Sequence, residues 1–331
     1  MILHPTVIAN LLAAYTSSLM LVYAAYYGLQ ILRHWNIESG SELQLILERK
    51  TYLVSTVLSY VFGLQLLSLF LFVFTADSLR TLFVGAMCAA GTLNVNAFGY
   101  PTLVLKVVNF VTSGLWLVLN HADNQGYDYP LIKKKYLLLI VITPFIVLET
   151  LLETAYFLGM EPDVITSCCG SLFSGEKKAG LGSELASLPA IPTLWAFYLT
   201  VIITLISGLV FYFKNRGGYV YALLSFALFI IALIAIVSVI SIYIYELPTH
   251  HCPFCIIMED YSYIGYLLYV LLFGGVVAGS GIGIILPFRK IESLKHALGG
   301  FINKLALTSV LMYGAFTVIV TYRIIFSNLI M

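Results

Sequence analysis

A short segment with two histidines and two cysteines holds the densest reactive chemistry in this sequence. His250 and His251 precede Cys252, and Cys255 completes a Cys-Pro-Phe-Cys motif. Thiols at this spacing either exchange electrons as a dithiol or, together with imidazole, bind a soft metal ion. Because an apolar run follows at 255–287, the motif is predicted to open a membrane helix, where water meets lipid.

The other three cysteines fall in two different segments. Cys88 follows the second apolar run, and Cys168 and Cys169 are adjacent within 159–190. Such cysteines are either structural disulfides, with several pairings open, or partners in a dithiol relay. We favour the relay, because the short loop between the cysteines of a CxxC motif is poorly suited to a structural disulfide. A helix N-terminus, with Pro253 in its first turn, also favours the thiolate form of the cysteines. Cys88 is expected to be a buried free thiol.

The composition predicts that membrane helices position these groups. The chain is 60% hydrophobic and 10% charged, whereas a soluble domain carries about 25% charged residues. We therefore expect an all-α polytopic transmembrane bundle, a single integral membrane domain over 1–331 with the lipid bilayer as its partner. A net charge of +1 provides no basic field for nucleic acid. Gly275, Gly279 and Gly283 recur every fourth residue and predict close helix contact.

About eight spans are predicted from the apolar runs. A stretch at 36–50 resembles a short amphipathic helix on the cytoplasmic face. The segment 80–100 is too short to cross the membrane and predicts either a re-entrant half-helix over 81–90 or an interfacial helix with a loop. The predicted spans are 5–32, 51–75, 101–120, 136–158, 191–213, 218–245, 255–287 and 304–326.

The distribution of basic residues predicts the orientation. Most of the 17 lysines and arginines fall in alternate connections, such as Lys133 to Lys135 and Lys214 to Arg216. The positive-inside rule places those connections in the cytoplasm, so both termini are expected outside the inner (cytoplasmic) membrane. All five cysteines then lie on the outer side, and 159–190 is an outer loop. Disulfides persist in that compartment.

The cysteine arrangement resembles known quinone-linked thiol oxidoreductases. A Cys-Pro-Phe-Cys motif at a helix mouth, with a second cysteine pair in an outer loop, is similar to the disulfide-bond formation protein B and vitamin K epoxide reductase families. The resemblance implies that Cys252 and Cys255 face a bound quinone. It implies that Cys168 and Cys169 exchange with an outer-side, thioredoxin-like partner. Those families have fewer spans than this chain, and their loop cysteines are separated rather than adjacent.

Charged residues inside the predicted spans are candidates for proton transfer. Lys106, Glu149, Glu153, Glu259 and Asp260 all fall in the outer half of the bilayer on the predicted topology. Glu149 and Glu153 share one helix face, so both should point into the bundle, toward Lys106 or the start of the seventh span. Glu153 or Glu259 would donate protons to thiol or quinone chemistry. The alternative is ion pairing that only fixes helix packing.

Three functions from different classes follow. The leading hypothesis is a membrane thiol-disulfide oxidoreductase that exchanges electrons between an outer thiol protein and a membrane quinone. The second is a non-enzymatic permease or membrane-complex subunit with structural disulfides. The third is outward-facing copper or zinc handling by His250, His251, Cys252 and Cys255, with Met258 nearby as a further soft ligand.

Overall fold

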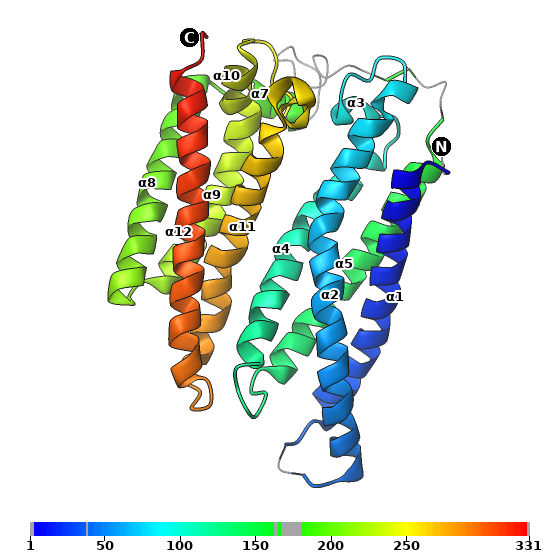
Figure 1. The fold of residues 1–331 in the computed structure, drawn as a ribbon, viewed down its shortest axis with the longest axis vertical. Coiled ribbons are helices and arrows are strands. Elements are labelled where there is room, and N and C mark those ends of the chain that lie inside the picture. The colour runs from blue at the N-terminus through cyan, green and yellow to red at the C-terminus, as the bar shows by residue number, and fades with distance from the viewer. Residues whose placement is uncertain (1–2, 38, 162–164, 167–180, 330–331) are drawn as a thin grey trace. The chain divides into compact units, whose positions relative to one another are not determined.

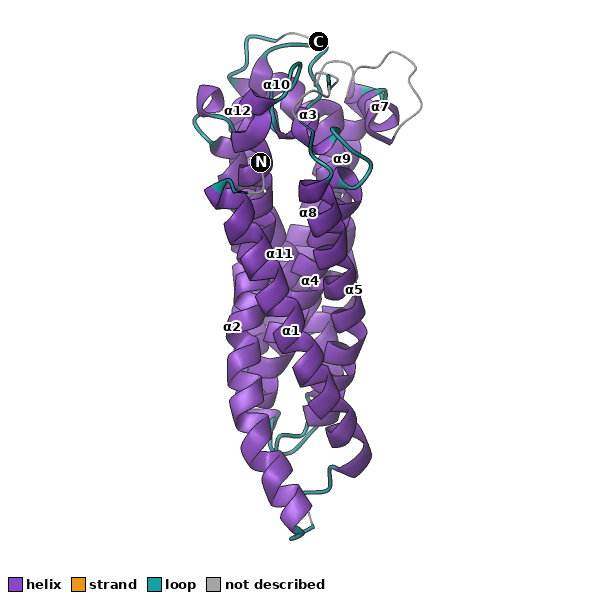
Figure 2. Cartoon of the chain, turned by 90° about the vertical axis from the view of Figure 1, so that its right-hand side faces the viewer, coloured by secondary structure: helices purple, strands orange, loops and turns teal. Residues whose placement is uncertain are grey.

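The computed structural model describes residues 3–37, 39–161, 165–166 and 181–329. Over these residues the chain forms helices joined by loops, and it contains no strand (Figures 1 and 2). Eight helices are long and apolar enough to cross a membrane. The predicted all-α multi-pass fold is therefore confirmed.

Each of the long helices overlaps one of the predicted spans. Three of them end in or contain a tighter or wider turn: η1 extends α2, the π-helical turn η2 joins α9 to α10, and η5 extends α11. The elements are α1 Pro5–His34, α2 Glu42–Ser78, η1 Leu79–Leu82, α3 Ala89–Leu93, α4 Gly99–Asp123, α5 Ile132–Leu158, α7 Leu181–Ala186, α8 Ala190–Lys214, α9 Gly218–Ala235, η2 Ile236–Ile240, α10 Ser241–Tyr245, η3 Cys255–Ile257, η4 Glu259–Tyr261, α11 Ile264–Ile285, η5 Leu286–Phe288 and α12 Lys295–Ile325.

Two predicted elements differ near the second span. The separate amphipathic helix at 36–50 is wrong, because α2 begins at Glu42 and continues without a proline to Ser78. The half-helix predicted over 81–90 is also wrong. There the chain forms the short η1, a loop and then the five-residue α3.

The seventh span was predicted to begin at the cysteine motif, and this is wrong. Two three-residue 3₁₀ turns, η3 and η4, occupy the stretch after Cys255, and α11 begins only at Ile264. Ser262 and Tyr263 have φ values of +55° and +54°, in the left-handed region that helices of L-residues avoid. These two residues therefore separate the motif from the membrane helix.

The chain divides into two compact units. Unit 1 comprises Met1–Phe72, Asn96–Met160 and Ile284–Ile302, and unit 2 comprises Val73–Val95, Glu161–Gly283 and Asn303–Met331. In unit 1, α5 packs against both α1 and α4. The rings of Phe62 and Trp116 lie 4.6 Å apart in its core, and the Trp116 indole N–H donates to the Lys135 carbonyl at 3.0 Å.

The predicted glycine ridge organises unit 2. A Cβ on Gly275 would press on the Tyr313 ring, one on Gly279 would collide with the side chains of Ser225 and Ser309, and one on Gly283 would meet Ala222. The helices approach this closely only because these glycines lack side chains, so the prediction of close contact is confirmed.

Candidate functional site

Three buried thiols converge in unit 2. The Sγ atoms of Cys88 and Cys252 lie 3.6 Å apart, and with that of Cys255 all three lie within 4.8 Å of one another. The side chains are 0%, 0% and 6% exposed, and none of the three is in a disulfide. Cys88 is buried as predicted, but the prediction left it apart from the CxxC pair. These three residues are called the thiol cluster below.

The loop before α3 carries Cys88 into the cluster. Cys88 caps α3, and its carbonyl accepts the Gly91 N–H at 3.0 Å. Thr166 fastens this loop twice, since its hydroxyl donates to the Gly91 carbonyl at 2.7 Å and its N–H donates to the Val84 carbonyl at 3.0 Å. Gly85 allows this contact, because its φ of +91° is strained for other residues and any Cβ would collide with the Thr166 carbonyl.

Two tyrosine hydroxyls hold the loop that carries Cys252 and Cys255. Tyr245, the last residue of α10, donates to the Cys252 carbonyl at 2.5 Å, and Tyr269 on α11 donates to the Pro253 carbonyl at 2.7 Å. The thiols are therefore positioned by a loop clamped at both flanking helices. The predicted helix-dipole effect on these thiols does not apply, because only the three-residue η3 begins at Cys255.

His250 lies beside the thiol cluster. Its Nε2 is 3.3 Å from the Cys255 Sγ, and its ring meets the edge of the Tyr245 ring at 4.7 Å between centroids. Burial lowers the pKa of His250. The neutral imidazole that this favours is the form that binds metal ions.

His251 contacts the backbone instead of the thiol cluster. Its Nδ1 lies 3.2 Å from the Val237 carbonyl and 3.1 Å from the Ser238 carbonyl, so it must carry a proton and donate to them. Both carbonyls belong to the π-helical turn η2, where the regular helical hydrogen-bond ladder is interrupted. Of the two histidines in the predicted metal set, His250 lies beside the thiols, and the Nδ1 atom of His251 is engaged with the backbone.

The geometry fits a soft metal ion. With metal–sulfur bonds of about 2.3 Å, a tetrahedral site places its sulfur atoms about 3.8 Å apart. The Cys88 and Cys252 sulfur atoms already lie at 3.6 Å. Three thiolates and one imidazole are a zinc-type donor set, and three thiolates alone suit Cu(I). A disulfide would require two sulfur atoms to close to about 2.05 Å.

The other predicted site residues in this part of the chain lie elsewhere. Glu259 and Asp260 are exposed on η4 instead of inside a membrane helix. Their predicted place inside the seventh membrane helix is therefore wrong, because α11 begins only at Ile264. Cys168 and Cys169, the predicted exchange pair, lie outside the residues that the structure describes.

A second buried polar cluster lies in unit 1, where Lys106 pairs with both predicted carboxylates. Its Nζ is 2.8 Å from Glu149 Oε1 and 3.0 Å from Glu153 Oε2, and all three residues are buried. The predicted inward orientation is confirmed. Gln65 and Ser68 of α2 also reach this cluster and were not predicted to do so. Their spacing of three residues within an apolar span places both side chains on one helix face, and this spacing could have indicated a buried polar contact.

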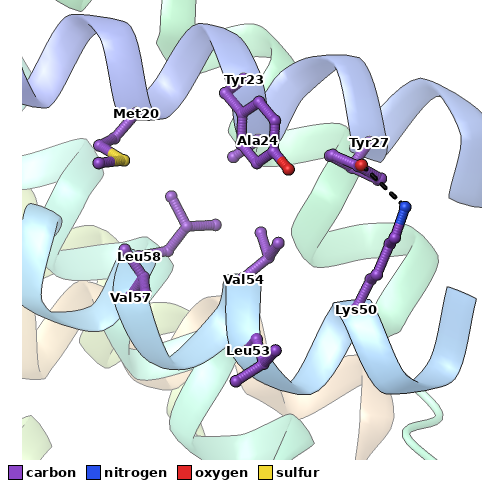
Figure 3. Close-up of a pocket in the computed structure, with 9 residues that line it drawn as sticks. All are labelled: Met20, Tyr23, Ala24, Tyr27, Lys50, Leu53, Val54, Val57 and Leu58. Carbon is purple, nitrogen blue, oxygen red and sulfur yellow. Dashed lines mark hydrogen bonds between the residues drawn. The ribbon is translucent and has the colours of Figure 1, made fainter.

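An apolar groove of about 380 Å³ separates α1 from α2 within unit 1 (Figure 3). Its walls include Met20 and Leu58, and its polar end is formed by Lys50, whose Nζ donates to the Tyr27 hydroxyl at 3.0 Å. The volume is in the range that holds a small organic molecule. The groove belongs to unit 1, whereas the thiol cluster belongs to unit 2.

Comparisons with protein-family models, with curated proteins and with solved structures find no match to this chain. The two buried clusters are therefore the observations that bear on function.

Proposed function

We propose that this multi-pass membrane protein binds a soft metal ion, Cu(I) or Zn(II), at the thiol cluster. Cys88, Cys252 and Cys255 would be the sulfur ligands, and His250 would be the fourth. The observation that supports this most is the position of Cys88, 3.6 Å from a CxxC motif that lies far along the chain. A dithiol exchange needs only two thiols, whereas a third thiol and an imidazole complete a metal-binding set.

Burial also favours a small ion over a protein partner. In thiol–disulfide exchange, the attacking sulfur of one protein must contact the sulfur of the other. Cys88 and Cys252 are fully buried, so a folded partner has no surface to attack there. A cation can reach such a site, and its charge offsets the cost of burying the thiolates that bind it.

The predicted topology would place this site at the outer face of a cytoplasmic membrane, with both termini outside. The protein would then handle copper or zinc from the outer side, as opposed to buffering metal in the cytoplasm.

Quinone-linked thiol oxidation is the second candidate, and the 3.6 Å contact between the Cys88 and Cys252 sulfur atoms is what favours it. Oxidation would join these two sulfur atoms and pass two electrons and two protons to a quinone, which leaves as the quinol. The thiols of Cys168 and Cys169 would then reduce the Cys88–Cys252 disulfide by exchange and become a disulfide themselves. The thiols of an outer thioredoxin-like protein would reduce that disulfide and be oxidised in turn. This chemistry would use the same cluster without a stoichiometric metal.

Metal analysis of protein purified without chelators under anaerobic conditions separates the two functions. The metal hypothesis expects stoichiometric copper or zinc in the wild type and in Cys168→Ser/Cys169→Ser, but not in Cys88→Ser or Cys252→Ser. Co(II) added to stripped protein should give the intense visible bands of a tetrahedral thiolate site. A metal-free cluster whose alkylation state follows added quinone would overturn the metal hypothesis and support the redox function.

A further inference from the structure

The buried cluster of unit 1 contains unequal numbers of positive and negative groups. Lys106, Glu149 and Glu153 are each at most 1% exposed, and they contribute one ammonium and two carboxyl groups. An uncompensated charge in the membrane-spanning part of a protein is costly. The cluster becomes neutral only when it gains one further positive charge.

A second ion pair in the same unit shows what a balanced site looks like. Lys135 Nζ lies 2.7 Å from Asp123 Oδ2, and both side chains are fully buried. The other Asp123 oxygen accepts the Leu131 N–H at 2.8 Å, and the Lys135 Nζ also donates to Ser55 and Asn120, each at 3.1 Å. One cation meets one anion, so this pair requires no further ligand.

The two carboxyl groups of the unequal cluster differ in their surroundings. Glu149 accepts from Lys106 at 2.8 Å, from Asn109 Nδ2 at 2.5 Å, and from Gln65 Nε2 at 3.0 and 2.8 Å. Such a ring of donors stabilises a carboxylate anion. Glu149 is therefore the permanent partner of Lys106.

Glu153 has no comparable set of donors. Its Oε2 lies 3.0 Å from the Lys106 Nζ, but among the described residues no group donates a well-aligned hydrogen bond to either Glu153 oxygen. Asn109 Oδ1 in the same cluster also lacks a donor among the described residues. A proton on Glu153 would remove the excess charge and supply a donor.

Among the residues that the structure describes, the elements around Glu153 present no other charge that could balance it. Lys106 comes from α4 and Glu149 from α5, while α2 contributes the uncharged Gln65 and Ser68. On α1, the Tyr15 hydroxyl bonds to Thr154, next to Glu153 on α5.

We propose that Glu153 is a proton-binding site, and that unit 1 is a proton-responsive part of this membrane protein. One proton from water converts the Glu153 carboxylate to the acid, and the charge of the cluster changes from −1 to zero. Glu153 is five residues before Leu158, the end of α5, or about 7.5 Å along the helix axis. The proton is therefore exchanged at that end. This inference rests on unit 1 alone and does not depend on the metal function of unit 2.

Infrared difference spectroscopy during a pH titration of the protein in lipid nanodiscs tests the proposal. The wild type should show a carbonyl band of a protonated carboxylic acid that disappears on alkalisation. Glu153→Gln should remove this band while the protein stays folded, because glutamine is neutral and of the same shape. The matched control Asp123→Asn should retain it. Glu149→Gln should weaken it at neutral pH, because the remaining carboxylate of Glu153 then balances Lys106 and stays ionised.

Each opposite outcome overturns the proposal. A wild-type protein without a titrating band, or a band that survives in Glu153→Gln, means that Glu153 binds no proton. If Glu153→Gln fails to fold, Glu153→Asp decides instead: the band should shift in frequency if it belongs to residue 153, and an unchanged band would overturn the proposal.

Discussion

The carboxylate cluster of unit 1 and the thiol cluster of unit 2 are both buried, yet they are stabilised in opposite ways. Lys106 and Glu149 are charged, and neighbouring helices supply donors such as Gln65 to compensate them. The thiols of Cys88 and Cys252 are neutral when protonated, and they lie against each other. A buried charge must have its partners for the fold to form, whereas a buried thiol needs a partner only when it binds or reacts. The first cluster should therefore determine stability, and the second should determine function.

The largest expected effect comes from removing the lysine of the carboxylate cluster. Lys106→Met would leave two buried carboxyl groups without their ammonium, which should cost about 3–5 kcal/mol of unfolding free energy. Lys135→Met, which leaves Asp123 unpaired, is the matched variant in the balanced pair and should cost a similar amount. Denaturant unfolding in detergent measures both. A loss below about 1 kcal/mol for Lys106→Met would show that this cluster does not determine stability.

The thiol cluster should show the reverse pattern. Cys252→Ser replaces a neutral group by a similar one, so the unfolding free energy should change by only about 1 kcal/mol. Metal affinity should fall by at least about 100-fold, since loss of a ligand exceeds the 10–100-fold cost of losing its supporting contacts. Competition titration with a chromophoric chelator measures the affinity. Unchanged binding together with severe unfolding would reverse the comparison.

A glycine substitution tests whether loop geometry, as opposed to helix packing, builds the thiol cluster. Gly85→Ala places a Cβ against the Thr166 carbonyl at a φ of +91°. It should cost about 1–3 kcal/mol and weaken metal binding, because the loop that carries Cys88 must move. Gly217 has a φ of +80° with open space around it. Gly217→Ala should therefore lower the unfolding free energy through backbone strain and leave the metal affinity unchanged. Equal loss of affinity in both variants would contradict this explanation.

These clusters also differ in how far the sequence predicts them. The spacing of Glu149 and Glu153 places both on one helix face, and the cost of charge in lipid requires that face to point inward, so Lys106 could be named as their partner. The eight spans follow from hydropathy for a similar reason. Lys135 was missed because it belongs to a run of three lysines that resembles an ordinary cytoplasmic signal, while the folded chain buries it against Asp123.

The thiol cluster was only half predicted, because loops assemble it. No periodicity relates Cys88 to Cys252, and their contact depends on the left-handed Gly85 and on the hydrogen bonds of Thr166. Hydropathy likewise placed the start of the seventh helix too early. Ile256 and Ile257 continue the apolar run, yet the chain turns at Ser262 before α11 begins. Conformations of this kind depend on tertiary contacts that residue type alone does not specify.

The smallest expected effect is a pH dependence at the chain's C-terminal end. Hydrogen bonds from the Asn328 side chain and then from its backbone N–H lower the pKa of Glu246. A carboxyl group whose pKa is lower in the folded state stabilises the fold above its unfolded pKa, and this contribution is lost as the pH falls through the folded value. The contact should therefore persist at neutral pH and open only in acid, below the ordinary pKa range of a glutamate side chain. At each pH, deuterium uptake at Asn328 is measured in the wild type and in Glu246→Gln. The ratio of wild-type to variant uptake should rise as the pH falls, because only the wild type loses a carboxylate. Because Glu246 is exposed, solvent screening keeps the effect local, and global unfolding should not change. Equal uptake in both proteins at every pH would mean that the ionised carboxylate does not hold this end of the chain.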